Sequence, residues 1–315
     1  MLQAARSQIL VLAAVCAFAP ASSSWRGITP AVERCAGETI ELLQTPNART
    51  PFVRLEVDGR SGPFLLDYGA TRSSLAAVGA SGNGARVRIA SFSLPSFGEG
   101  RFGVRPRLGN GERLGVIGTD LLSRLTADFD FRDGGGDVVF SERPCDRATL
   151  GRRGMIAISQ NGFFSSDYSR VRAGMPNVPI VWLRIGPVAA WAQIDTGYDD
   201  SVLPPSIDIN DRLYEKLVAA GVAMKKSNSI DVRTCAGVET RAVYRVDDVA
   251  IAALGGRDIQ RLEGVSLLRK PSSVCGGIAM MDEPAAQIGI SALRQLGGIV
   301  FDPKSEMVWV APKSR

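Results

Sequence analysis

The sequence predicts an all-β protein built from two related halves. Its 315 residues include 34 glycines and 17 prolines, which favour frequent turns, and long helical patterns are few. Apolar and polar side chains alternate with a period of two in stretches such as 52–57 and 180–185, a pattern typical of half-buried strands. The same order of elements then occurs twice along the chain, so we expect both halves to fold in the same way.

The N-terminus predicts export. Residues 1–21 have the features of a secretory signal peptide: a positive charge at Arg6, an apolar stretch over 9–19 and a cleavage site at 19–21, with 17–19 as the competing site. The apolar stretch is too short to span a bilayer. We therefore expect an exported protein, periplasmic or secreted, with no stable membrane insertion once the signal peptide is removed.

Each half contains an aspartate directly after an apolar strand. These residues are Asp67 and Asp195, and a glycine, Gly69 or Gly197, stands two positions later. Glycine has no Cβ, so other groups can approach its backbone closely. Two carboxylates that face one another cannot both ionise; they share a proton and can activate a water molecule. The alternative is that either aspartate serves only to form the tight turn after its strand.

An apolar strand that ends in glycine follows later in each half, at 114–118 and 286–289. Thr119 or Ser291 comes next, and either could cap a short helix. Closing strands are then predicted at 127–131, 137–140, 298–302 and 307–310. Because several elements recur in the same order, the repeat is more specific than a lone Asp-Thr-Gly sequence.

In these features the chain resembles aspartic proteases of the retropepsin and pepsin group. Residues 194–203 are similar to the active-site strand of retroviral proteases, while 116–118 and 287–289 resemble the hydrophobic-hydrophobic-glycine element of the family. The resemblance covers about two-thirds of the mature chain, in two tandem copies. It implies a bilobal aspartic-protease-like fold, in which two related β-barrel lobes carry short helices.

The resemblance divides the chain into two lobes and a connection. We expect the N-terminal lobe over 22–146, the interlobe connection over 147–175 and the C-terminal lobe over 176–315, with a crossing strand at 155–159. The second lobe has an insertion that contains a predicted helix. Asp208 or Asn210 would cap this helix, and Gly221 would end it. Its apolar face would consist of Leu213, Leu217 and Val218.

The resemblance also implies a catalytic pair formed by Asp67 and Asp195. One carboxylate acts as general base on a shared water, and the protonated one donates to the oxygen of the scissile carbonyl. The residues expected to support this pair are Thr196, Gly197, Gly69, Tyr68, Gly118 and Gly289. This chemistry needs no cofactor and no metal.

Tyr68 departs from the family pattern, in which Thr or Ser follows this aspartate. The hydroxyl of that residue reaches across to the backbone of the other lobe. Thr196 can make this contact, whereas the hydroxyl of Tyr68 stands several ångströms too far out, so the interlobe contact is expected to be one-sided. The ring of Tyr68 could instead pack into the interface, with its hydroxyl bonded elsewhere.

The resemblance places four residues near a bound substrate. Tyr198 stands where the family usually has Ala, and Asp199 and Asp200 would contact the substrate backbone or brace the site. A solvated polar turn is the alternative for these two aspartates. Phe97 would be the tip of a flap hairpin that closes over the substrate, and an ordinary surface hairpin is the alternative.

The cysteines predict one disulfide in each lobe. Cys16 is removed with the signal peptide; its lipidation is the alternative, although the residues before it form a poor lipobox. Of the remaining four, Cys35 and Cys145 bracket the first copy of the repeat, and Cys235 and Cys275 lie inside the second. Reduced thiols are the alternative, disfavoured outside the cytoplasm.

Composition excludes several other functions. The chain contains no histidine, which excludes Ser-His-Asp and Cys-His catalysis and any zinc site with histidine ligands. Its net charge of +5 comes from basic residues scattered along the chain, without the clustered pattern of a nucleic-acid-binding surface.

The sequence therefore predicts a monomeric aspartic endopeptidase that binds a polypeptide substrate in an extended conformation. Two alternatives remain. The first is a catalytically impaired peptide-binding protein of the same fold, favoured by Tyr68 and Tyr198. The second is a structural or inhibitor-like envelope protein that uses only the stable fold.

Overall fold

The structure is a computed structural model, which describes residues 33–45, 48–57, 60–76, 87–89, 91–94, 103–105, 114–131, 136–159, 178–198, 202–203, 205–234, 237–253, 256–273 and 277–313. The predicted signal peptide, Cys16, Phe97, Asp199, Asp200, Cys235 and Cys275 lie outside these residues. The described residues form mainly strands in several sheets, which confirms the all-β prediction. None of their helices is long and apolar enough to cross a membrane.

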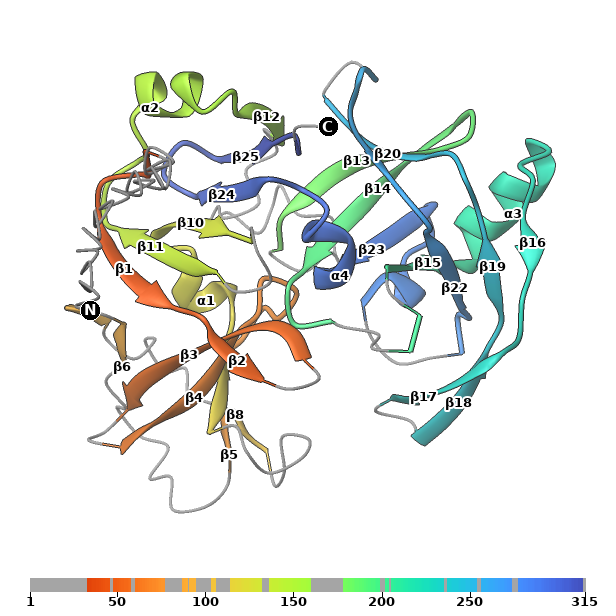
Figure 1. Cartoon of the computed structure of the whole chain (residues 1–315). Helices are drawn as coiled ribbons and strands as arrows, with labels where there is room; N and C mark the ends of the chain where they lie inside the picture. The colour runs from red at the N-terminus through yellow and green to blue at the C-terminus, as the bar shows by residue number, and fades with distance from the viewer. Residues whose placement is uncertain are drawn as a thin grey trace, which may run out of the picture. The chain divides into compact units, whose positions relative to one another are not determined.

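The first half of the chain folds mainly into β-strands, with two short helices among the described residues (Figure 1). Its elements are β1 (Glu38–Glu41), β2 (Leu43–Thr45), β3 (Ala48–Val57), β4 (Arg60–Leu66), β5 (Ser74–Ala76), β6 (Val87–Ile89), β7 (Phe92–Leu94), β8 (Gly103–Arg105), β9 (Gly115–Ile117), α1 (Thr119–Leu122), β10 (Thr126–Asp130), β11 (Asp137–Ser141), α2 (Arg147–Arg152) and β12 (Ile156–Ser159).

The second half continues with more strands and one longer helix. Its elements are β13 (Ile180–Ile185), β14 (Val188–Asp195), β15 (Ser206–Asn210), α3 (Asp211–Ala219), β16 (Lys225–Lys226), β17 (Ile230–Thr234), β18 (Gly237–Arg241), β19 (Val243–Arg245), β20 (Val249–Ala252), β21 (Asp258–Leu262), β22 (Ser266–Lys270), η2 (Gly277–Met280), β23 (Ala285–Gly289), α4 (Ile290–Leu293), β24 (Gly298–Asp302) and β25 (Met307–Ala311).

The two halves repeat the same strand pairings. In the first half β4 pairs parallel with β9, β5 pairs antiparallel with β9, and β5 pairs parallel with β8. In the second half β14 pairs parallel with β23, β15 pairs antiparallel with β23, and β15 pairs parallel with β22. Each half forms its own main sheet around this unit. The repeat predicted from the sequence is therefore present at the level of strand pairing.

A third sheet contains strands from both halves. Its order is β1-β11-β10-β24-β25-β12, and β10 pairs antiparallel with β24, so that Ala127 lies opposite Phe301. The predicted crossing strand is β12, which pairs with β25 near the C-terminus. Figure 1 shows β10 and β11 of the first half beside β24 and β25 of the second. This shared sheet joins the halves through backbone hydrogen bonds.

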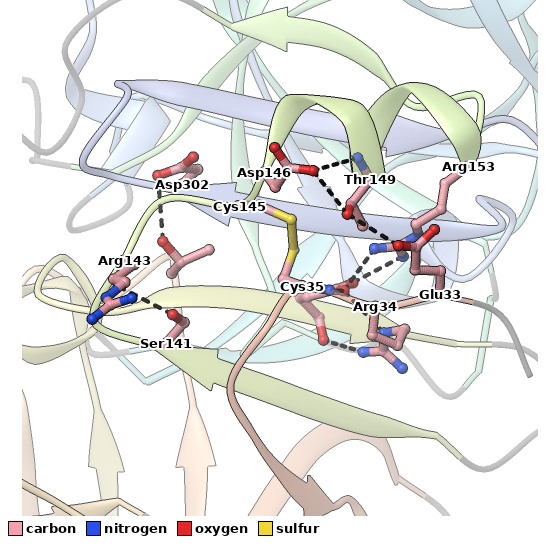
Figure 2. The surroundings of a disulfide bond; sticks show 12 residues. Glu33, Arg34, Cys35, Ser141, Arg143, Cys145, Asp146, Thr149, Arg153 and Asp302 are labelled. Carbon is pink, nitrogen blue, oxygen red and sulfur yellow. Dashed lines mark hydrogen bonds and ion pairs between the residues drawn. A yellow bond between two sulfur atoms is a disulfide. The ribbon is translucent and has the colours of Figure 1, made fainter.

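The start of the first half is fixed by a disulfide and buried charges. Cys35 and Cys145 form a disulfide across 110 positions, which confirms the pairing predicted for the first lobe. Figure 2 shows it between the chain before β1 and the start of α2, with Arg34 and Arg153 nearby. The fully buried Asp128 accepts hydrogen bonds from Arg34 Nε at 2.9 Å, Arg153 Nη1 at 2.6 Å and the Cys35 amide at 3.0 Å. Such donors are what a buried carboxylate requires.

The predicted helix in the insertion is α3, with one correction. Asn210 is its cap, because its side chain accepts from Leu213 N at 2.9 Å, and Gly221 follows the helix with φ 68°. Leu213 and Leu217 are buried. The prediction that Val218 shares their face is wrong, since this side chain is 53% exposed.

The predicted caps of the two short helices are also wrong. The cap positions of α1 and α4 are Gly118 and Gly289, and Thr119 and Ser291 lie inside the helices. A side-chain cap is not needed for the first amide of either helix. That amide donates to Ala70 O at 2.8 Å in α1 and to Tyr198 O at 2.9 Å in α4. Both helices are thus attached to the turns that follow the two aspartates.

Candidate active site

Strand pairing positions the two aspartates in equivalent places. Asp67 follows β4, and its amide donates to Ile117 O, the last residue of β9, at 2.9 Å. Asp195 ends β14 in register with Gly289, the last residue of β23. A methyl group at Gly118 would lie 2.7 Å from Ala70 O, and one at Gly289 would lie 2.6 Å from the ring of Tyr198. Only glycine lets each of these strands end against its aspartate turn.

The structure brings the two carboxylates together. A methyl group at Gly69 would lie 2.5 Å from both carboxylate oxygens of Asp195. A methyl group at Gly197 would lie 2.3 Å from Oδ2 of Asp67. Each carboxylate therefore lies directly against the glycine of the other aspartate's turn. Any larger side chain at these glycines would displace the opposite carboxylate.

Backbone amides fix the orientation of both carboxylates. Oδ1 of Asp67 accepts from Gly69 N at 2.8 Å and from Ala70 N at 3.1 Å. Oδ1 of Asp195 accepts from Gly197 N at 2.9 Å. Since these donors belong to the turns themselves, the carboxylates need no rearrangement to face one another.

One threonine joins the two turns. The hydroxyl of Thr196 donates to Leu66 O at 2.7 Å and accepts from Tyr68 N at 3.0 Å, and Thr196 is fully buried. The two partners are the residues immediately before and after Asp67, in the other half. The contact predicted for Thr196 is present.

We expect Thr196→Val to lower the free energy of unfolding by about 2–4 kcal/mol, because it removes the hydroxyl partner of two buried backbone groups. Thr196→Ser keeps the hydroxyl, so its free energy of unfolding should stay within about 1 kcal/mol of wild type. Denaturant unfolding checks this, and equal losses in both variants would contradict it.

The ring of Tyr68 packs between the halves. It stacks on Phe301 of β24, with ring centroids 3.7 Å apart and planes 12° apart, and meets Phe129 edge-on at 6.1 Å. Tyr68 is fully buried, which raises the pKa of its phenol well above the ordinary value. The residue that departs from the family pattern thus contributes an aromatic contact to the interface.

Tyr198 is held by a buried charge pair. Its hydroxyl donates to Asp208 Oδ1 at 3.0 Å, while Asp208 Oδ2 accepts from Arg241 Nη1 at 2.7 Å. Asp208 and Arg241 are 2% and 4% exposed. The structure thus places the hydroxyl of Tyr198 on this pair.

The environment of the aspartates favours a single retained proton. Burial raises the pKa of Asp67, and it raises the pKa of Asp195 well above its ordinary range. The neighbouring charge of Asp67 raises the pKa of Asp195 further, as does the hydrogen bond between the two carboxyl groups, which requires a proton on one of them. The pair can therefore offer an ionised carboxylate and a carboxylic acid side by side.

This arrangement predicts a pH-dependent stability. Because folding raises both pKa values, the pair contributes stability below about pH 4, and that contribution is lost as the pH rises through the raised values. Asp195→Asn removes one carboxyl group, so we expect its Tm to exceed that of wild type by about 2–4 °C at neutral pH. The difference should disappear in acid. Calorimetry across this range checks the prediction, which a constant difference at every pH would contradict.

Three polar residues of the site escaped the sequence prediction. Gln287 Nε2 donates to Asp195 Oδ2 at 2.7 Å. Asp120 accepts from Ser73 Oγ at 2.6 Å, and that hydroxyl accepts from Gly118 N at 2.9 Å. The available signal for Gln287 was a polar residue within an otherwise apolar strand, where the first half has Val116.

No group of three or more His, Cys, Asp or Glu side chains that could hold a metal occurs within the described ranges. A scan of the chain against protein-family models finds no match. A search of the curated proteins finds no significant match.

Proposed function

We propose that this chain is an aspartic endopeptidase of bilobal, retropepsin- and pepsin-like fold, with Asp67 and Asp195 as its catalytic residues. One observation carries the proposal: each carboxylate lies against the glycine of the other aspartate's turn, so that both face a common space. The repeated strand pairings and the shared sheet support the assignment of the fold. Because both aspartates come from one chain, the enzyme acts as a monomer.

The chemistry follows from the shared proton. The ionised carboxylate takes a proton from a water held between the two acids, and the resulting nucleophile attacks the peptide carbonyl carbon. The other carboxyl group donates its proton to the carbonyl oxygen, so a neutral tetrahedral intermediate forms. Its collapse breaks the C–N bond, with a proton passed to the leaving nitrogen, and the pair returns to one proton.

The substrate is a polypeptide in an extended conformation, bound beside the site as an added strand. The Cys35–Cys145 disulfide supports a location outside the reducing cytoplasm, in the periplasm or the medium. This location agrees with the signal peptide that the sequence predicts.

The test is incubation of the mature protein with denatured casein from about pH 3 to pH 7, because a pair that must keep one proton is expected to work best in the acid part of such a range. Mass spectrometry of the products should show cleavage at internal peptide bonds. A protein that folds, with its disulfide formed, and cleaves at no pH would overturn the proposal.

A second candidate is a peptide-binding protein of the same fold with impaired catalysis. The observation that favours it is the one-sided contact between the turns, where Thr196 bonds across and Tyr68 packs its ring instead. Isothermal titration with casein-derived peptides separates the two. Binding without cleavage at any pH favours the second candidate.

A further inference from the structure

We propose that Gln287 is a positioning residue of the aspartate pair, which holds the second oxygen of Asp195 and favours the ionised state of the pair. The inference rests on the proposed function of Asp67 and Asp195. Gln287 lies outside the turns, on the neighbouring strand β23. Its role is to hold Oδ2 of Asp195, while Gly197 N of the turn donates to Oδ1.

The position of Gln287 follows from strand register. On β23 it stands two residues before Gly289, which is in register with Asp195, so Gln287 lies on the same face of the sheet as the aspartate. It is 9% exposed, and its Nε2 lies 2.7 Å from Asp195 Oδ2. Since Gly197 N already donates to Oδ1, both oxygens of Asp195 accept from fixed donors.

The surroundings orient the amide of Gln287. A methyl group at Gly277 would lie 3.6 Å from Gln287 Oε1 and 3.5 Å from Lys270 Nζ, so the amide oxygen and the ammonium border the same space. The positive charge of Lys270 favours the amide oxygen of Gln287 on this side, so the amide nitrogen is directed toward Asp195. Further along lie Asp208 and Arg241, which pair with one another, and Glu239, whose Oε2 is 3.8 Å from Arg241 Nε.

The two halves differ at this position. The residue two places before the glycine is Gln287 in the second half and Val116 in the first, which has no polar side-chain atom. Asp67 receives two backbone amides of its own turn on Oδ1. A donor to the charged form of a carboxylate lowers its pKa, so Gln287 offsets part of the effect of burial on the pair.

We expect Gln287→Leu to raise the lower apparent pKa of the pair by about one unit, since one charge-assisted hydrogen bond is lost. The acid limb of kcat/KM against pH should move up by the same amount. Gln287→Met keeps the length of the side chain and should shift the apparent pKa by the same amount. It replaces the leucine variant in this test if that variant does not fold.

Gln193 provides a matched control. It stands opposite Gln287 in the register of β14 and β23, and it is 5% exposed. Within the described part of the chain its Nε2 has no hydrogen-bond partner. Gln193→Leu therefore removes a buried glutamine at the same level of the sheet without removing a donor to Asp195, and it should leave the apparent pKa in place.

The measurement is the pH titration of the aspartate side-chain carboxyl carbons by ¹³C NMR, with signals assigned through Asp67→Asn and Asp195→Asn. It reads the pair directly, so it decides the role of Gln287 even if casein hydrolysis fails in wild type. An upward shift in the Gln287 variants alone supports the proposal. No shift in these variants, or an equal shift in Gln193→Leu, overturns it.

Discussion

Asp195→Asn is expected to lower kcat/KM for peptide hydrolysis by a thousandfold or more, on the order of what general acid–base groups contribute. An asparagine can neither take a proton from the attacking water nor hold the proton that the pair shares. An asparagine has the same shape but only one side-chain oxygen, so it can accept only one of the two hydrogen bonds that Gly197 N and Gln287 Nε2 donate to Asp195. The loss should therefore be one of chemistry, with the fold kept.

Asp231→Asn is the control for that experiment. Asp231 is an exposed aspartate on β17 that accepts from the Thr240 hydroxyl at 2.7 Å, and it belongs to a separate two-stranded sheet. It should retain wild-type activity. Initial rates on a labelled peptide give both values, and cleavage retained in Asp195→Asn would remove the pair from the mechanism.

The double variant Cys35→Ser, Cys145→Ser is expected to lose up to about 5 kcal/mol of unfolding free energy. The disulfide spans 110 positions, so it lowers the entropy of the unfolded chain by closing a long loop. Both cysteines are at least nine-tenths buried beside Asp128, and the first is bonded to that carboxylate through its amide. Without the disulfide, the segment that contains Arg34 and Cys35 is held less firmly, which should weaken the buried ion pairs of Asp128 with Arg34 and Arg153.

Differential scanning calorimetry should show a Tm lower by up to about 10 °C. The control is wild type unfolded with and without a thiol reductant, because reduction should move it toward the double variant. A double variant whose Tm stays within about 2 °C of wild type would contradict the stabilising role of this disulfide.

The sequence carried enough information to predict the repeat, because alternation, glycine spacing and the order of elements are local patterns. Asp67, Asp195 and the glycines beside them were predicted in this way, and so was the Cys35–Cys145 pair. The helix caps failed for a tertiary reason. The first amides of α1 and α4 bond to the aspartate turns, so Thr119 and Ser291 have no capping role.

Contacts between distant strands could not be predicted in the same way. Gln287 is 92 positions from Asp195, and only the parallel register of β14 and β23 brings them together. Arg34 and Asp128 are separated by 94 positions, and their pairing depends on the strands of the shared sheet. The packing of Tyr68 on Phe301 similarly requires that strands of both halves meet.

The most direct test of the shared-proton pair is the pH profile of kcat/KM from about pH 2 to pH 8 for wild type and Asp67→Asn. Two neighbouring acids that work with one proton between them predict a bell-shaped curve, whose limbs report the loss and the gain of that proton, and no measurable rate for Asp67→Asn. Hydrolysis that survives in Asp67→Asn, or that climbs steadily into alkali, would contradict the account.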